Sequence, residues 1–118
     1  RPILVSEGGV KGRIALPHSA RITATNHARL YGLAPRKGMI AVGADADIVL
    51  WDPTITRTIT QSELHHGADY TPWEGFAVTG WPVATFLRGA PLIRDGVLLA
   101  EGRGGVIDCG QPDLRALP

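Results

Sequence analysis

The chain has 118 residues, of which 44% are hydrophobic and 19% charged, and its formal net charge is +1. This length allows one domain or part of one, and the 12 basic residues are too scattered to form the positive face that nucleic acid or an acidic membrane surface would require. No stretch approaches the ~20 apolar residues that span a bilayer, so we expect neither nucleic acid nor a membrane as a partner.

The N-terminal residues and the cysteine content bear on the cellular location of the chain and on whether it is part of a longer protein. Cys109 is the only cysteine, so an intrachain disulfide is impossible and a reducing, cytoplasmic location is expected. Residues 1–4 contain neither an initiator methionine nor a signal-peptide pattern. We therefore expect a segment of a longer cytoplasmic protein.

The first predicted element is helical. Residues 21–33 contain no proline and only one glycine, and Ile22, Leu30 and Leu33 provide apolar positions at helical spacing. One or two short helices are expected here, with Thr25 or Asn26 as the N-cap of the second and Gly32 as its stop. The chain then divides at residues 35–38, after which the pattern becomes that of β-structure.

Two strands are predicted directly after this division. Residues 46–51 form a compact apolar run that ends in Asp52-Pro53, which is typical of a strand followed by a turn. Residues 54–60 alternate threonine with Ile55, Arg57 and Ile59, which is the period-two pattern of a half-buried strand.

A long connection and a hairpin follow. Residues 61–80 form a polar and aromatic loop, and loops of this length usually have a function or pack on a partner. Strands are predicted over residues 83–87 and 91–99, with a tight turn at Asp95-Gly96. Residues 101–118 are rich in glycine and polar side chains, which indicates a surface tail.

Six sequence motifs occur in order along most of the chain. They are NHARLYGLAPRKG at 26–38, IAVGADADIVLWDP at 40–53, HHGADYTPWEGF at 65–76, GWPV at 80–83, LRG at 87–89 and GRG at 102–104. Together they resemble the closing segment of the cyclic amidohydrolases, in particular dihydropyrimidinases and hydantoinases. Residues 1–12 are also similar to the approach to the last barrel helix of that family. The strand motif alone is moderately specific, but the combination with DYTPWEG and GWPV is strong.

The resemblance implies a fold and its domain boundaries. The chain is expected to be a fragment of an α/β amidohydrolase, with terminal barrel helices followed by part of a small β-sandwich. Residues 1–37 would be the last part of the TIM-barrel domain, residues 38–106 the C-terminal part of the composite β-sandwich domain, and residues 107–118 a polar tail. Because the rest of the enzyme chain would complete the sandwich, the isolated chain should be marginally stable.

The resemblance also implies an activity. The full-length protein would hydrolyse the ring amide of dihydropyrimidines or 5-substituted hydantoins to N-carbamoyl amino acids, as a homodimer or homotetramer. Enzymes of this family use two divalent metal ions, typically zinc, bridged by a carboxylated lysine and held by four histidines and an aspartate. No residue of this chain matches those ligands, so no catalytic or metal-binding residue is expected and the chain alone should be inactive.

Asn26 is the one candidate site residue. In the family, the matching asparagine lies at the barrel mouth and meets the substrate ring, mostly through its main chain, so Asn26 is expected to bind the cyclic amide or imide. A helix N-cap is the alternative role, and both can hold. His27 stands where the family most often has proline, which leaves the geometry of this loop open.

Other polar residues have structural interpretations that compete with catalytic ones. Asp45 and Asp47 could act as an acid–base pair, but hydrogen bonds at the strand entrance are favoured. The adjacent His65 and His66 would point to opposite faces of an extended segment, which is poor geometry for binding one ion. Glu74 is expected to accept a hydrogen bond from an arginine or a backbone amide.

Three alternatives to the hydantoinase interpretation remain open at this stage. Allantoinases share the ADAD-type strand, a His-His pair and an Arg-Gly hairpin, although DYTPWEG and GWPV favour a dihydropyrimidinase or hydantoinase. A non-catalytic relative, similar to the collapsin-response mediators, would keep the fold and assemble into tetramers. A natural stand-alone module is the third alternative.

Overall fold

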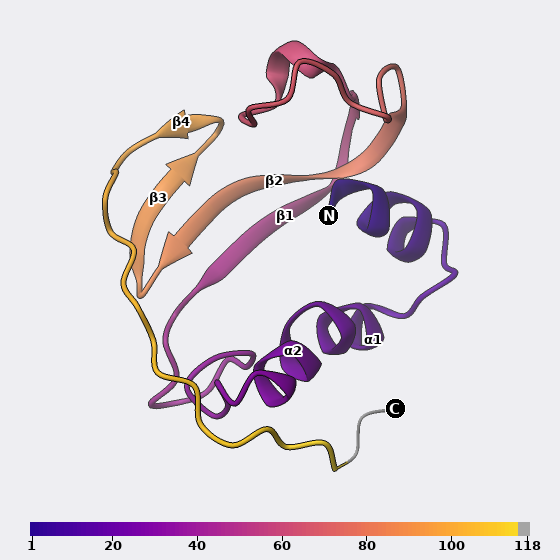
Figure 1. Cartoon of the computed structure of the whole chain (residues 1–118). Helices are drawn as coiled ribbons and strands as arrows, with labels where there is room; N and C mark the ends of the chain where they lie inside the picture. Colours follow the sequence, from indigo (N-terminus) through magenta and orange to yellow (C-terminus); the bar gives the residue numbers. More distant parts are fainter. Residues whose placement is uncertain (116–118) are drawn as a thin grey trace.

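The computed structural model describes residues 1–115 and consists of a helical segment and one antiparallel sheet. The helices lie along one side of the two long strands, and the tail returns from the far end of the sheet towards them (Figure 1). The structure agrees in outline with the expected order of helices followed by strands.

The helical segment has two parts. A wide-turn π-helix, η1 (Leu4–Val10), comes first. A second helix is built without a break from α1 (Leu16–Ala20), the π-helical η2 (Arg21–Thr25) and α2 (Asn26–Leu30). The helix predicted over 21–33 is therefore confirmed in type, but it begins earlier, with a proline near its start where the missing N–H costs nothing.

The end of α2 confirms the predicted stop at Gly32. This glycine has a φ of +64°, and the N–H of Leu33 donates to the carbonyl of Ala28 at 2.7 Å while that of Gly32 donates to Arg29 at 3.1 Å. These two bonds form a Schellman motif, which requires a left-handed residue after the helix.

The predicted N-cap at Thr25 or Asn26 is wrong, because both residues lie inside the continuous helix. Thr25 has helical backbone angles, φ −62° and ψ −47°, and Asn26 has φ −66° and ψ −39°. The side chain of Thr25 makes no capping bond. The hydroxyl of Thr25 instead donates to the carbonyl of Gly38 at 2.8 Å. The side chain therefore ties the helix to the loop that follows it.

The sheet contains four strands in the order β1-β2-β3-β4, all antiparallel to their neighbours. Their bounds are Ile48–Thr58 for β1, Ala77–Leu87 for β2, Ala90–Arg94 for β3 and Val97–Leu98 for β4. The turn at Asp95-Gly96 is confirmed, since both residues have positive φ values, of 50° and 80°. Positive φ at both central positions defines the type I′ turn that matches strand twist.

Two strand boundaries differ from the prediction. Residues 46–60 do not form two strands separated by a turn, because β1 continues through Pro53 with a register shift between Asp52 and Thr56. The carboxylate of Asp52 accepts from the N–H of Thr54 at 2.8 Å and from its hydroxyl at 2.6 Å. This local bonding turns the expected break into a bulge.

The second difference concerns the long loop. It ends before residue 80, because β2 already begins at Ala77. Val78, which the sequence analysis placed in the loop, is the most deeply buried large side chain of the described residues, with 1% of its surface exposed.

Helix η1 packs directly on β2. Ser6 is buried, and its hydroxyl oxygen accepts from the backbone N–H of Thr79 at 3.1 Å. A Cβ atom at Gly80 would lie 2.7 Å from Cγ1 of Val5, so only glycine permits this close approach. The sheet and the helical segment therefore meet at Thr79 and Gly80.

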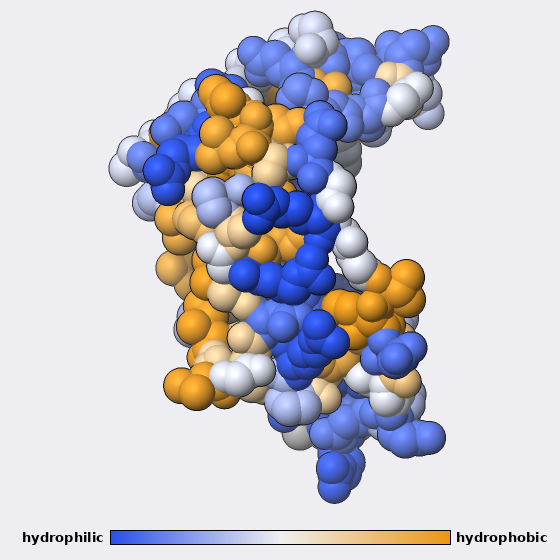
Figure 2. Space-filling view, turned by 90° about the vertical axis from the view of Figure 1, so that its left-hand side faces the viewer, coloured by the Kyte–Doolittle hydropathy of each residue, from blue (hydrophilic) through white to orange (hydrophobic). Residues whose placement is uncertain are grey.

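Few apolar side chains are buried. Within residues 1–115 they are Ala28, Ile59, Val78 and Ala84. Large apolar side chains remain exposed in the loop at Ile40 and on the outer strand at Leu98. Figure 2 shows apolar groups exposed in several places on the face turned to the viewer. No helix of the described part of the chain has the length and apolar character needed to cross a membrane.

Candidate functional site

Asn26 lies at the junction between the wide turn η2 and α2. Its backbone N–H donates to the carbonyl of Arg21, five residues earlier, which is the bonding pattern of a π-turn. Such turns inside α-helices occur frequently at functional sites. The family resemblance implies that the main chain of Asn26 meets the substrate, but in this structure its backbone N–H already donates a hydrogen bond within the helix.

The side chain of Asn26 is different, because its amide oxygen is buried without a hydrogen-bond partner. Ser19, about two helical turns earlier, also has a buried hydroxyl oxygen without a partner. Leaving a buried polar group unsatisfied costs roughly 1–3 kcal/mol. Of these two oxygens, only that of Asn26 belongs to the residue that the family resemblance places at the substrate, so it is the candidate for a contact that the chain's own residues do not provide.

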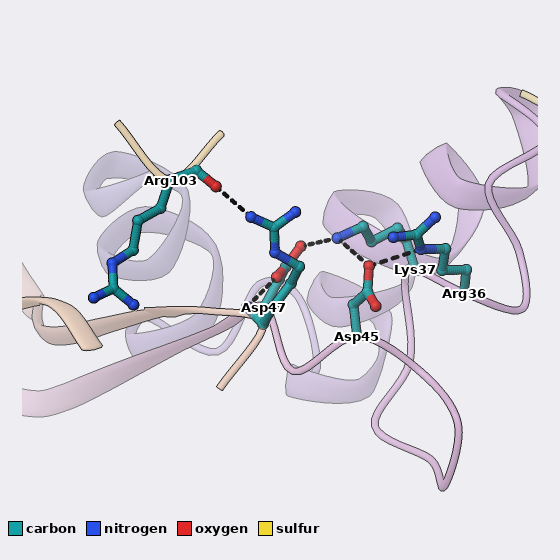
Figure 3. Close-up of polar contacts among 6 residues, drawn as sticks. Arg36, Lys37, Asp45, Asp47 and Arg103 are labelled. Carbon is teal, nitrogen blue, oxygen red and sulfur yellow. Dashed lines mark hydrogen bonds and ion pairs between the residues drawn. The ribbon is translucent and has the colours of Figure 1, made fainter. Parts of the chain in front are cut away.

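The densest polar cluster lies where the chain passes from the helices to the sheet. Its centre is Lys37, which forms ion pairs with Asp45 at 2.7 Å and with Asp47 (Figure 3). Arg36 also binds Asp45, at 2.9 Å. The second carboxylate oxygen of Asp47 accepts from the backbone N–H of Arg88 at 2.8 Å. The cluster thus joins the loop after α2 to the start of β1 and to the β2–β3 turn.

The pKa values of this cluster follow from the contacts. Partial burial opposes the charge of Lys37, but its hydrogen bonds to Asp45 and Asp47 outweigh that effect and raise its pKa. The hydrogen bond from Lys37, followed by that from Arg36, lowers the pKa of Asp45. Burial acts to raise the pKa of Asp47, yet the bonds from Lys37 and Arg88 lower it overall. All three pKa values are thus shifted further from neutral pH, whereas a general acid or base works best with a pKa near the operating pH.

The structural interpretation of Asp45 and Asp47 therefore agrees with the contacts. Lys37 was not predicted to be their partner from the sequence. A signal was present, since two adjacent basic residues precede two closely spaced aspartates by about ten residues, but that spacing does not reveal which charges meet.

The remaining candidates lie on the loop between β1 and β2, which contains the short helix η3 (Gln61–Glu63). The prediction for Glu74 is confirmed, because its carboxylate accepts from the backbone N–H of Gln61 at 2.7 Å. His66 accepts from the N–H of Ala68 through Nδ1 at 3.2 Å, so this histidine shapes the loop. Trp73 stacks edge-on against Phe76, with ring centres 5.8 Å apart.

The described residues do not form a metal centre. Among residues 1–115 there is no group of three or more His, Cys, Asp or Glu side chains placed to hold an ion, and the Asp45 and Asp47 carboxylates are already occupied by Lys37. The described residues therefore do not fit the two-metal site that the family resemblance implies.

Comparison with known proteins adds a family assignment to this geometry. Residues 6–92 match the sequence model of the amidohydrolase family. A D-hydantoinase of Geobacillus stearothermophilus is 52% identical over 93 residues, which are 79% of this chain and 20% of that protein. A D-hydantoinase of Ralstonia pickettii is 41% identical over 105 residues, which are 89% of this chain and 23% of that protein.

Solved structures show the same likeness in three dimensions. The crystal structure of a dihydropyrimidinase from Brevibacillus agri superposes with a TM-score of 0.80 at 47% identity, over 83% of this chain and 21% of that one. An L-hydantoinase (dihydropyrimidinase) from Arthrobacter aurescens gives a TM-score of 0.82 at 34% identity, over 85% of this chain and 22% of that one. The chain spans about a fifth of the length of the relatives that it matches. Because the family match covers most of its residues, the chain belongs to the amidohydrolase family.

Proposed function

We propose that this chain is the C-terminal part of a metal-dependent cyclic amidohydrolase. The whole enzyme would hydrolyse the ring amide of dihydropyrimidines or 5-substituted hydantoins and release N-carbamoyl amino acids. The observation that supports this most strongly is the 52% identity to a D-hydantoinase along most of the chain. The matched relatives and structures bear the names of hydantoinases and dihydropyrimidinases, which favours this reaction over allantoin hydrolysis and over a non-catalytic assembly role.

Within that enzyme we propose that Asn26 binds the substrate through its side chain. A cyclic amide presents ring N–H donors and carbonyl acceptors, and the unpartnered amide oxygen of Asn26 would accept one ring N–H. The backbone N–H of Asn26 is engaged with Arg21, so it is not the donor in this proposal.

The rest of the site is proposed to come from residues outside this chain. Two divalent metal ions, zinc in our proposal, would be held there and would supply an activated water for attack on the ring carbonyl. This chain would contribute residues 1–37 to the barrel domain and residues 38–106 to the composite sandwich, with residues 107–118 as a tail whose last three residues lie outside the described part.

An oligomer is part of the same proposal. Tyr70 and Trp73 lie in the long loop with 69% and 46% of their surfaces exposed, and exposed aromatic side chains are enriched at protein interfaces. We propose that this loop packs on another segment or subunit of a cytoplasmic homodimer or homotetramer. Replacing both residues with alanine in the full-length protein should weaken the oligomer on size exclusion.

The activity is tested with two preparations, the full-length protein and this chain alone. Each is incubated with zinc and either dihydrouracil or a 5-substituted hydantoin, and the N-carbamoyl product is measured. We expect product from the full-length protein and none from the chain above a metal-only control. If the full-length, metal-loaded protein opened neither ring, the proposed function would be wrong. Turnover by the chain alone would contradict the view that it is only part of the site.

A further inference from the structure

The segment that follows β4 crosses the molecule without forming a helix or strand within residues 99–115. It begins at the outer edge of the sheet and ends beside the C-terminal end of α2 (Figure 1). Two sets of hydrogen bonds fix this path, one at each end, and both use backbone groups of the tail.

The first anchor is on the sheet side. The guanidinium of Arg88, in the turn between β2 and β3, donates to the carbonyl of Arg103 (Figure 3). The backbone N–H of Arg88 binds Asp47, which pairs with Lys37. The start of the tail is therefore connected to the polar cluster between the helices and the sheet.

The second anchor is on the helix side. The N–H of Gly110 donates to the carbonyl of Gly32 at 2.8 Å, and the N–H of Asp113 donates to the carbonyl of Arg29 at 3.0 Å. The carbonyl of Arg29 already accepts from the N–H of Gly32 in the Schellman motif, and the tail adds a second donor to it and a donor to the carbonyl of Gly32 just beyond the helix. Asp113 also lies near Arg29, whose positive charge contributes to lowering the pKa of Asp113 after the larger effect of its bonds with Arg115.

The backbone contact at this anchor depends on glycine. A Cβ atom at Gly32 would lie 2.1 Å from the carbonyl oxygen of Gly110, a distance at which the two chains would have to separate. A Cβ at Gly110 would lie 3.3 Å from the carbonyl oxygen of Gly32. Both positions therefore allow the tail to approach the helix end closely.

We propose that residues 103–113, the tail strap, hold the C-terminal end of α2 in place relative to the sheet and thereby position Asn26. The positioning part of this inference rests on the proposed function, because it assumes that Asn26 meets a substrate. Asn26 precedes Arg29 by three residues, so the strap binds the helix within one turn of Asn26. Loosening the strap would let this turn fray, and the amide of Asn26 would lose its fixed direction.

The test uses a matched pair of proline substitutions in the full-length protein. Gly110→Pro removes the N–H that binds Gly32. Gly67→Pro makes the same change outside the strap, in the loop between β1 and β2, where the amide donates no backbone hydrogen bond to a described residue and a Cβ would have no atom within 4 Å. Hydrogen exchange is followed by mass spectrometry in peptides that cover residues 26–33 and 106–115. We expect exchange in these peptides to be faster by at least about fivefold in Gly110→Pro, the equivalent of one hydrogen bond, and unchanged in Gly67→Pro.

A second pair approaches the contact from the helix side and guards against a misfolded proline variant. Gly32→Ala and Gly12→Ala both place alanine at positive φ, of 64° and 70°. Only in Gly32→Ala would the new Cβ also clash with the tail, since no atom lies within 4 Å of a Cβ at Gly12. We expect faster exchange at residues 106–115 in Gly32→Ala but not in Gly12→Ala. Equal hydrogen exchange in all variants and the wild type would contradict the proposal that the tail strap holds the end of α2.

Kinetics on dihydrouracil separate positioning from simple stability. If the strap positions Asn26, Gly110→Pro should raise KM about three- to tenfold, the range expected when one hydrogen bond is weakened, with a smaller change in kcat. Faster exchange with an unchanged KM would overturn the positioning role while leaving the proposed hydrolase intact. A wild-type protein that fails to turn over the substrate would contradict the proposed function, and the exchange measurement would still decide whether the strap exists.

Discussion

The junction between the helices and the sheet is held in a different way from the outer hairpin of β3 and β4. At the junction, Ser6 binds Thr79 across 73 positions, and the loop around Lys37 is tied to β1 and to the β2–β3 turn. In the hairpin, the partners lie close in sequence, and Leu98 in β4 has 55% of its surface exposed.

The contacts at the junction join several elements, whereas those in the hairpin are local. A change at the junction disturbs side chains from several elements at once, whereas a change in the hairpin disturbs one turn. The junction should therefore be far more sensitive to substitution, even where the backbone conformation is the same. We therefore compare substitutions at the junction with the wild type or with substitutions in the hairpin and in the loop between β1 and β2, all in the full-length protein.

The largest expected effect is at Gly38. Gly38 and Gly96 both have positive φ, of 85° and 80°, so alanine costs each about 1–2 kcal/mol of strain. At Gly38 the new Cβ would also lie 2.5 Å from that of Ala28, and such overpacking adds about 1–3 kcal/mol. Chemical denaturation should show the larger loss in Gly38→Ala. Equal losses of unfolding free energy in Gly38→Ala and Gly96→Ala would contradict the expectation that the junction is more sensitive to substitution than the hairpin.

Ser6→Ala should have the next largest effect. It leaves the N–H of Thr79 without its partner beneath η1, and an unsatisfied buried donor costs roughly 1–3 kcal/mol. Ser62→Ala is the control, because the hydroxyl of Ser62 makes only a 3.5 Å contact with Thr60 among residues 1–115. Thermal unfolding should separate the two variants. A Ser6→Ala protein as stable as the control would show that the N–H finds another acceptor.

Lys37→Gln tests how the ion pairs at the junction contribute to stability as a function of pH. Asp45 and Asp47 have folded pKa values below their ordinary value of 3.8, so their pairing stabilises the fold above that pH and is lost as pH falls through the lower folded value. Lys37 has a folded pKa above 10.5, so its contribution is complete below that pH and is lost as pH rises through the higher value.

The wild type should therefore exceed Lys37→Gln in melting temperature by a few degrees from about pH 5 to about pH 9, where all three groups are charged. The difference should shrink at both extremes. A difference that stayed constant from neutral pH down to about pH 3, well into the titration range of free aspartate, would mean that charge pairing is not its cause.

The smallest effect is expected in the hairpin. Asp95→Gly keeps the N–H that donates to Val83 at 2.8 Å and suits the φ of 50° at this position. The stability change should stay within about 0.5 kcal/mol, as for most surface substitutions. A loss as large as that of Ser6→Ala would show that the hairpin is coupled to the junction after all.

Elements with local determinants were predictable from the sequence. The turn at Asp95-Gly96 follows from the tolerance of glycine for positive φ, and the stop at Gly32 follows from the same property. The continuation of β1 through Asp52 and Pro53 was not predictable, because it depends on pairing with β2 across the bulge. Thr25 was a plausible N-cap by residue type, but the helix that precedes it removes the free N–H groups that a cap would satisfy.

The candidate site was predictable only in part. Asn26 stands out through its place in a family motif, and Glu74 through its position in the loop. The pairing of Lys37 with Asp45 and Asp47 requires the turn between them to fold back, and the contact between Gly110 and Gly32 joins residues that no short-range pattern relates.

The central claim is that this chain supplies Asn26 to a cyclic-amide site, and one matched pair tests it most directly. Asn26→Ala and Ser19→Ala each remove a buried oxygen that has no partner among residues 1–115, so neither should destabilise the full-length protein by the cost of a broken hydrogen bond. Only Asn26→Ala should lower kcat/KM on dihydrouracil, by about tenfold for the loss of one substrate hydrogen bond. Equal kcat/KM in Asn26→Ala, Ser19→Ala and the wild type would contradict the claim.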